Sequence, residues 1–283
     1  MIKTKLLTEE EKLHLKNNGE LSLFFIGVGS AFSKINNQTN LLIIKGDSHL
    51  LIDCGTTCPK AMWGYGCPVI NVENIFITHS HADHIGGMEE VALMGRYFTK
   101  RKPKLIVVDE YKDALWNYSL KGGIAFNEIH DGKILEFEDI FEIKNPKLIK
   151  ESPYRMWEIN IGEINLKIYR TKHIPDSEND REKCFFSYGT IINNRVLFTA
   201  DTRFDKELIF YILENYKDIK IIFHDCQLFT GGVHASYNEL LTFPENIRKM
   251  MYLVHYGDNY KSIIPENDGF LGFAQQGIYY IIE

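Results

Sequence analysis

The sequence predicts an α/β fold in which two β-sheets are flanked by helices. Three observations support this prediction. Apolar runs of strand length recur along the whole chain, segments of helical composition lie between some of them, and no linker rich in Pro, Gly or Ser divides the sequence. No internal repeat is present. We therefore expect residues 1–283 to form one domain, with residues 1–20 as an N-terminal extension.

The expected strands are rich in Ile, Val, Phe and Tyr, and most of them end at Gly, Asn or Asp. They cover residues 21–28, 41–44, 50–52, 74–78, 104–108, 164–169, 185–192, 195–199, 219–223 and 251–254. The expected helices cover residues 57–64, 86–97, 110–120, 205–216 and 236–241. In the N-terminal extension we expect a short helix, followed by a turn at Asn17-Asn18-Gly19.

Composition and charge are those of a soluble globular protein, with 45% hydrophobic and 25% charged residues. The formal net charge is −6 and no dense run of Lys and Arg occurs, whereas proteins that wrap a long polyanion usually have a basic face. The first twenty residues lack the apolar core of a signal peptide, and no stretch is long enough to span a bilayer. We expect a cytoplasmic protein that has no membrane contact and forms no stable nucleic-acid complex. Its cysteines are expected to be reduced and buried: Cys54, Cys58, Cys67, Cys184 and Cys226.

The strongest local signal is the segment from Thr78 to Gly87, THSHADHIGG. It follows an expected strand and precedes an expected helix, so its first two histidines leave the strand end and the next two polar residues lie in the turn. Imidazoles and a carboxylate are the ligands that a borderline-soft divalent ion such as zinc selects. The sequence therefore predicts a metal site formed by His79, His81, Asp83 and His84.

This His-x-His-x-Asp-His run resembles the signature of the metallo-β-lactamase superfamily, which implies an αββα sandwich. Further matches occur in the order of that family, each after an expected strand: His173, then Asp201 in the run FTADTRF, then His255. The resemblance implies two divalent ions, with zinc expected and manganese as the alternative. It assigns His79, His81 and His173 to one ion, Asp83, His84 and His255 to the other, and Asp201 to both.

Several segments are similar to the ribonuclease Z branch of the superfamily. The run FTADTRF resembles its SGDTRP, residues 232–236 (GVHAS) resemble its His-Ser-Thr segment, and residues 255–260 (HYGDNY) resemble its His-Phe-Ser-x-Arg-Tyr. His224-Asp225-Cys226 resembles its His-Glu-Ala, and residues 51–55 (LIDCG) resemble its early strand and glycine turn. The resemblance implies that His234 protonates the leaving oxygen and that Asp225 orients it. Asp83 is expected to orient the nucleophile and to accept its proton.

One difference from ribonuclease Z indicates that the expected substrate is small. The tRNA-processing enzymes carry a long arm between the histidine and the aspartate that correspond to His173 and Asp201, but here only 28 residues separate the two positions. The chain is most similar to arm-less phosphodiesterases of the phage-type anti-Pycsar family, which cleave 3′,5′-cyclic mononucleotides. The expected function is hydrolysis of a small phosphodiester, a cyclic nucleotide, to a linear monophosphate. A homodimer is expected from the resemblance alone.

Three alternatives stay open at this point. A ribonuclease Z-type endoribonuclease and a thioester or lactone hydrolase share the fold, since hydroxyacylglutathione hydrolases also contain THxHxDHxGG. The segments around Asp201 and His234 argue against the thioester hydrolase, and the complete ligand set argues against a non-catalytic binding protein. Off the metal motifs, the aromatic residues considered for stacking on a base are Tyr111, Trp116, Tyr118, Tyr154 and Trp157.

Overall fold

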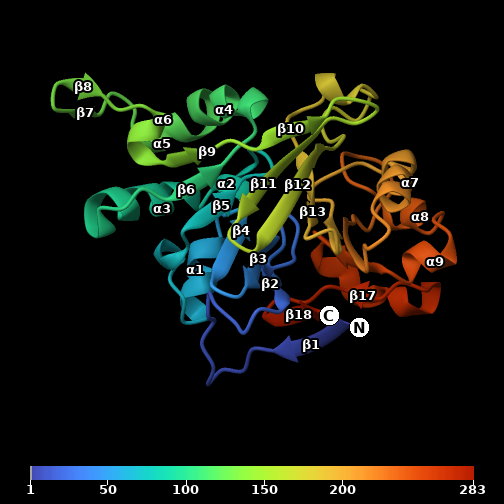
Figure 1. Cartoon of the computed structure of the whole chain (residues 1–283). Helices are drawn as coiled ribbons and strands as arrows, with labels where there is room; N and C mark the ends of the chain where they lie inside the picture. The colour runs from blue at the N-terminus through green and yellow to red at the C-terminus, as the bar shows by residue number, and fades with distance from the viewer. Residues whose placement is uncertain (1) are drawn as a thin grey trace.

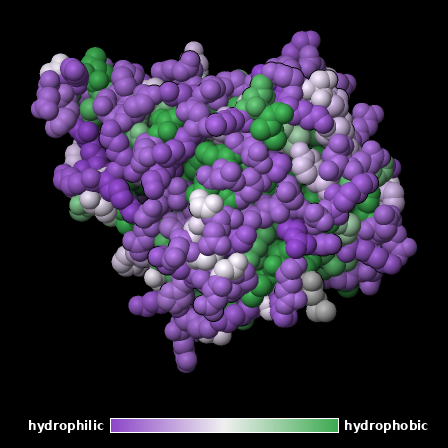
Figure 2. All heavy atoms as spheres, viewed as in Figure 1, coloured by the Kyte–Doolittle hydropathy of each residue, from purple (hydrophilic) through white to green (hydrophobic). Residues whose placement is uncertain are grey.

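The computed structural model describes residues 2–283 and consists of two mixed β-sheets packed between layers of helices (Figure 1). Each large sheet contains eight strands, and a separate two-stranded hairpin projects from the body of the protein. The face seen in Figure 2 is mainly hydrophilic, with small apolar areas between polar side chains. This αββα arrangement confirms the predicted fold class.

The first sheet has the strand order β1-β18-β2-β3-β4-β5-β6-β9. Its first half is antiparallel, whereas β4, β5, β6 and β9 run parallel to one another. The strands are β1 (Ile2–Leu6), β18 (Ile278–Ile282), β2 (Leu21–Gly27), β3 (Asn40–Lys45), β4 (Ser48–Ile52), β5 (Asn74–Phe76), β6 (Lys104–Ile106) and β9 (Glu142–Lys144).

The second sheet has the strand order β10-β11-β12-β13-β14-β15-β16-β17. Its strands are antiparallel up to β14 and parallel from β14 onward. They are β10 (Lys147–Lys150), β11 (Met156–Ile161), β12 (Ile164–Arg170), β13 (Tyr188–Ile192), β14 (Val196–Phe198), β15 (Ile221–Asp225), β16 (Met251–Val254) and β17 (Gly272–Phe273). The projecting hairpin pairs β7 (Ile129–His130) with β8 (Lys133–Ile134).

Helices cover the outer face of each sheet (Figure 1). On the side of the first sheet lie α1 (Cys58–Gly64), α2 (Ala82–Ile85), α3 (Met88–Met94), α4 (Asp109–Leu115), α5 (Lys121–Ile124) and α6 (Phe137–Ile140). On the side of the second sheet lie α7 (Lys206–Asn215), α8 (Tyr237–Leu240) and α9 (Glu245–Arg248). Short helical turns complete the list: η1 (Val69–Asn71), η2 (Gly95–Thr99), η3 (Trp116–Leu120), η4 (Arg181–Lys183), η5 (Asp258–Ser262) and η6 (Pro265–Asp268). None of the helices in the described part of the chain is both long and apolar enough to cross a membrane.

The expected helix in the N-terminal extension is wrong. Residues 2–6 form the edge strand β1, which pairs antiparallel with β18, so that both ends of the chain lie side by side (Figure 1). The following residues are irregular, and the side chain of Leu13 anchors them by inserting into the core. A short isolated helix has little stability in water. Backbone pairing with the edge of the sheet is therefore more favourable for this segment than the helix that its composition suggested.

The structure also corrects several expected boundaries. The two expected helices at residues 86–97 and 110–120 each consist of an α-helix that continues into a π-helical turn, α3 into η2 and α4 into η3. Besides β1, the strands that the sequence did not predict are β7, β8, β9, β10, β11, β17 and β18. β18 lies inside the first sheet, between β1 and β2, so this sheet is larger than the sequence predicted.

An aromatic cluster packs the two sheets together. The ring of Phe25 on β2 lies 4.8 Å from that of Phe223 on β15 and 5.8 Å from that of Tyr280 on β18, and the last two rings are 5.1 Å apart. All three side chains are buried. Aromatic side chains bury a large apolar area, so this cluster sets the spacing between the sheets.

We expect Phe223→Ala to lower the free energy of unfolding by about 3–5 kcal/mol, the usual cost of removing a buried aromatic ring. Urea unfolding at a fixed metal concentration measures this change. The exposed residue Phe126 provides the control, since Phe126→Ala removes a ring that is 70% exposed and should change stability little. Similar values for the two variants would show that the ring cluster does not hold the sheets together.

Candidate active site

The site lies where the parallel strands of both sheets end. Strand β5 of the first sheet leads into the segment with His79 and His81, and strands β14 and β16 of the second sheet lead to Asp201 and His255. His173 follows the end of β12. The carboxyl edge of parallel strands is where α/β sheets commonly form ligand sites, because several loops converge there.

The turn after β5 is fixed by a buried carboxylate. Asp53 accepts hydrogen bonds from the backbone N–H of Thr78 at 2.8 Å and from its hydroxyl at 2.7 Å. The same carboxylate lies 2.7 Å from Nδ1 of His84. Asp53 therefore determines which way His84 points and leaves its Nε2 directed toward the site.

Asp83 and His84 lie in the helix α2 rather than in the open turn that the sequence predicted. The backbone N–H groups of His84 and Ile85 both donate to the carbonyl of His81, each at 2.9 Å, and this winds the segment into a helical turn. The side chains of Asp83 and His84 still converge, since the carboxylate lies 3.2 Å from Nε2 of His84.

A first group of possible metal ligands consists of His79, His81, His173 and Asp201, whose ligand atoms all lie within 4.8 Å of one another. Nδ1 of His81 is 3.0 Å from Nε2 of His79 and 3.3 Å from Nε2 of His173. Nδ1 of His173 donates to the carbonyl of Val233 at 2.9 Å, which leaves its Nε2 free to bind an ion. Such a backbone contact is the usual support of a metal-binding histidine.

A second group consists of Asp83, His84, Asp201 and His255. Nε2 of His255 lies 3.1 Å from Asp83 and 3.5 Å from Asp201, and Nε2 of His84 lies 3.3 Å from Asp201. Asp201 belongs to both groups. The structure thus brings all seven side chains predicted as ligands into two adjoining clusters that share one carboxylate.

Two unsatisfied atoms show that these residues fit a metal ion. Nε2 of His84 and Oδ2 of Asp201 are buried, and neither has a hydrogen-bond partner among residues 2–283. A buried carboxylate oxygen without a partner is strongly destabilising. A divalent cation at this position would satisfy both atoms, and a mixed set of imidazoles and carboxylates suits zinc.

The pKa values separate the two groups. Burial lowers the pKa of His79 well below its ordinary value and that of His173 to about 4, so both imidazoles are neutral and offer a lone pair at pH 7. Burial opposes protonation of His84 and His255 as well, but the carboxylates outweigh it. Asp201 contributes most to raising the pKa of His84 well above its ordinary value and that of His255 to about 10. The second group therefore requires positive charge, which a divalent ion supplies in place of protons.

His234 and Asp225 form a hydrogen-bonded pair beside the second group. Nδ1 of His234 lies 2.8 Å from the Asp225 carboxylate, which also accepts from the backbone N–H of Thr202 at 2.8 Å. The ring of His234 stacks on that of His255 with 4.7 Å between the centroids. Burial lowers the pKa of His234, but the Asp225 carboxylate raises it above its ordinary value, which favours the protonated form. The side chain of His234 is 20% exposed and can reach a bound substrate.

The sequence reasoning missed the role of Asp53, which it noted only as part of a strand-and-glycine segment. A signal was present, because an aspartate directly after a run of apolar strand residues is placed at a strand end and needs hydrogen-bond partners when buried. Its backbone φ is +64°, and Ala200 (+48°) and His255 (+61°) have the same left-handed conformation next to or within the ligand set. Non-glycine residues in this region carry strain that is found most often at functional sites.

The aromatic residues considered for base stacking differ in how far they are exposed to solvent. Tyr111, Trp116 and Trp157 are buried in the core, and Tyr154 packs edge-on against Tyr211 with 4.7 Å between the ring centroids. Tyr118 is 89% exposed and is the only member of the considered set that lies open to solvent.

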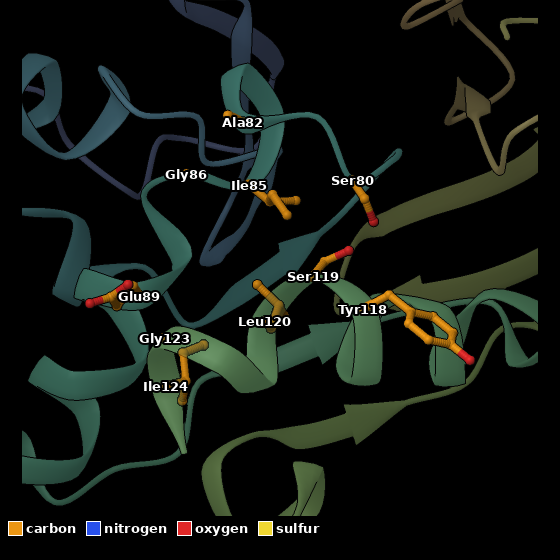
Figure 3. Close-up of a pocket in the computed structure, with 10 residues that line it drawn as sticks. All are labelled: Ser80, Ala82, Ile85, Gly86, Glu89, Tyr118, Ser119, Leu120, Gly123 and Ile124. Atoms are coloured by element: carbon orange, nitrogen blue, oxygen red, sulfur yellow. The ribbon is translucent and has the colours of Figure 1, made fainter. Parts of the chain in front are cut away.

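A pocket of about 350 Å³ lies beside the HSHADH segment (Figure 3). Ser80, Ala82 and Ile85 line one side of it, and residues 118–120 line the other. The stick view shows the ring of Tyr118 pointing away from the centre of this pocket. None of the predicted metal ligands lines it.

Known proteins share both the sequence pattern and the fold. The family model of the anti-Pycsar protein Apyc1 matches residues 21–280. An Apyc1 protein of Bacillus phage vB_BsuM-Goe3 is 38% identical over 264 residues, which cover 90% of this chain and 96% of the phage protein. Another from Paenibacillus harenae is 38% identical over 234 residues, which cover 82% of this chain and 88% of that protein.

Solved structures resemble the fold at low sequence identity. The metallo-β-lactamase fold protein YhfI of Bacillus subtilis aligns with a TM-score of 0.66 and 16% identity over 93% of this chain and 100% of its own. The short form of human tRNase Z aligns with a TM-score of 0.62 and 15% identity over 91% of this chain and 98% of its own. The predicted resemblance is thereby confirmed. The chain is a metal-dependent hydrolase with the metallo-β-lactamase fold, and it belongs to the anti-Pycsar Apyc1 family.

Proposed function

We propose that this protein is a binuclear phosphodiesterase that opens a 3′,5′-cyclic mononucleotide to the linear monophosphate. The observation that carries the proposal is the pair of ligand clusters that share the Asp201 carboxylate. Membership of a family named for action against Pycsar supports a small nucleotide as substrate. A homodimer and a cytoplasmic location stay predictions from the sequence.

Two divalent ions, which we propose to be zinc, would lower the pKa of a bound water and neutralise the phosphoryl oxygens. In the proposed assignment, His79, His81 and His173 hold one ion and Asp83, His84 and His255 hold the other. The shared carboxylate of Asp201 fixes the two sites relative to each other.

In the proposed reaction, side chains of the protein accept and donate the protons. The carboxylate of Asp83 lies between His84 and His255, where it orients the attacking water and accepts its proton. His234, kept protonated by Asp225, donates a proton to the leaving ribose oxygen. A ribose alkoxide is strongly basic, so its departure depends on such a donor.

The loops around the site support a small substrate. Residues 174–187 form a short loop with the turn η4, and the hairpin of β13 and β14 then leads directly to Asp201, so residues 174–200 contain no projecting arm. The net charge is −6 and the sequence contains no dense run of Lys and Arg, so it gives no indication of the phosphate contacts that normally dominate nucleic-acid affinity. Bound ions held by the two ligand clusters would supply most of the attraction for phosphate, and they would accommodate one phosphodiester at a time.

We expect the protein purified without chelator and supplied with zinc to hold two ions per chain, measured by elemental analysis. Asp201→Ala should release both ions together and abolish activity, because this carboxylate belongs to both clusters. Asp113→Ala on the surface of α4 serves as the control and should keep both ions. One ion or none in the wild type would contradict a binuclear centre.

We expect His234→Ala to keep its metal content and to slow cyclic-nucleotide turnover by roughly 10²–10⁴-fold, the usual contribution of a positioned general acid. The rate of bis(p-nitrophenyl) phosphate hydrolysis should fall much less, since the nitrophenolate leaving group needs little protonation. His130→Ala, on the projecting hairpin, removes an imidazole that is 67% exposed and should have no effect on either substrate. Equal losses on the two substrates would show that His234 is not the acid.

We expect cyclic mononucleotides to be hydrolysed to linear monophosphates, with far weaker cleavage of precursor tRNA, because residues 174–200 form no arm that could grip a long polyanion. Chromatography of the products from both substrates at matched enzyme concentration measures this preference. Position-specific 3′ trimming of precursor tRNA, with cyclic mononucleotides left intact, would favour a ribonuclease Z-type function instead.

A further inference from the structure

The predicted ligands in the two clusters differ in their exposure to solvent. Six of the predicted ligands are buried, and His81 is the one that is partly exposed. His234, the expected proton donor, is partly exposed too. A substrate that reaches the metal centre must therefore enter where these two imidazoles lie.

Phe185 stands at this entrance. Its ring is nearly parallel to that of His81, at 17° with 5.1 Å between the centroids, and it meets the ring of His79 edge-on at 6.2 Å. One face of Phe185 thus covers a predicted metal ligand. Phe185 is nevertheless 36% exposed, so it remains accessible to solvent beside His81. None of the aromatic residues singled out from the sequence has this position.

The peptide group that joins Cys184 to Phe185 is held by hydrogen bonds through both its N–H and its carbonyl. The N–H of Phe185 donates to the carbonyl of Ile174 at 2.6 Å, and Nη2 of Arg170 donates to the carbonyl of Cys184 at 2.9 Å. The next residue, Phe186, is partly buried: the guanidinium of Arg170 lies 4.6 Å from the centroid of its ring, and the ring of Tyr111 lies 5.5 Å away. The backbone at Phe185 is therefore held in place by hydrogen bonds, and the adjacent Phe186 packs against Arg170 and Tyr111.

The loop that carries Phe185 is also tied to the predicted ligands. Arg203 donates to the carbonyls of Asp176 and Glu178 in this loop. At the end of the loop, the hydroxyl of Ser187 donates to the carbonyl of Asp201 at 2.9 Å. The ring thus has a defined position relative to the metal centre, and binding a planar group would cost little additional ordering.

We propose that the exposed part of the Phe185 ring is the surface on which the base of a nucleotide stacks while its phosphate binds the metal pair. This inference rests on the proposed function, because it names how that site recognises its substrate class. An aromatic ring accepts any base, since every base has a flat π-face, so it favours nucleotides over simple phosphodiesters without selecting one base.

Calorimetric titration of the zinc-loaded protein with adenosine 5′-monophosphate and with ribose 5-phosphate tests the proposal directly. The two ligands share the sugar phosphate and differ only in the base. We expect the wild type to bind the nucleotide roughly 5- to 150-fold more tightly, which corresponds to the usual contribution of base stacking on an aromatic ring. Equal affinity for the two ligands would overturn the proposal.

The variants separate stacking from protection of His81. Phe185→Leu keeps an apolar cover over the imidazole but removes the flat ring, so it should retain both ions and lose the preference for the nucleotide. Phe185→Trp should retain the preference. The control Phe98→Ala removes a ring that is 74% exposed on η2 and should change nothing. An unchanged preference in Phe185→Leu would overturn the proposal.

The outcome is independent of the proposed activity. Binding of a monophosphate requires the loaded metal centre but no turnover, so the titration decides on Phe185 even if cyclic nucleotides are not hydrolysed. Failure to hydrolyse any cyclic mononucleotide would refute the proposed function, whereas loss of the base-dependent affinity in Phe185→Leu would still establish the stacking surface.

Discussion

The buried carboxylate of Asp201 is the interaction on which the arrangement of the site depends. Its Oδ2 faces the Nε2 atoms of His84 (3.3 Å), His255 (3.5 Å), His79 (3.6 Å) and His173 (3.9 Å). These residues follow the ends of β5 in the first sheet and of β12 and β16 in the second. A charge in such a place is tolerated only when it is compensated. The strands of both sheets must therefore end near this carboxylate. This requirement fixes how the carboxyl-terminal edges of the two sheets lie relative to each other.

Backbone strain near this point shows how firmly the sheets are coupled. His255 has a positive φ, yet its N–H donates to the carbonyl of Val28 at 2.8 Å, which joins the end of β16 to the end of β2 across the two sheets. Asp53, also at positive φ, donates from its N–H to the carbonyl of Phe76 at 2.9 Å. Each such residue costs about 1–3 kcal/mol, so surrounding contacts must hold it in place. These contacts keep the imidazole of His255 and the carboxylate of Asp53 aimed at the site.

The sequence allowed the clustering of the predicted ligands to be foreseen more fully than the boundaries of the surrounding elements. His79, His81, Asp83 and His84 were identifiable because they cluster within six residues after an apolar strand. The resemblance to a known family then pointed to His173, Asp201 and His255, each after an expected strand. Boundaries and edge strands were less accessible: β18 enters the first sheet only through pairing with β1 and β2, and the helical composition near the N-terminus gave way to that pairing. Phe185 was missed for the same reason, since its contact with His81 joins residues far apart in the chain.

The loop between β12 and β13 links the fold to the size of its substrate. Ligands at strand ends are set by the sheets, so they can be kept by proteins that act on different molecules, whereas the loops around them decide what enters. Here the loop is short, and it is fastened by Arg203 and by the ion pair of Arg181 with Asp205. A fastened loop cannot extend along a polynucleotide, but it can hold one side chain rigidly over the metal centre. The same loop, which carries no long arm, also carries Phe185, the ring on which we propose that a single base stacks.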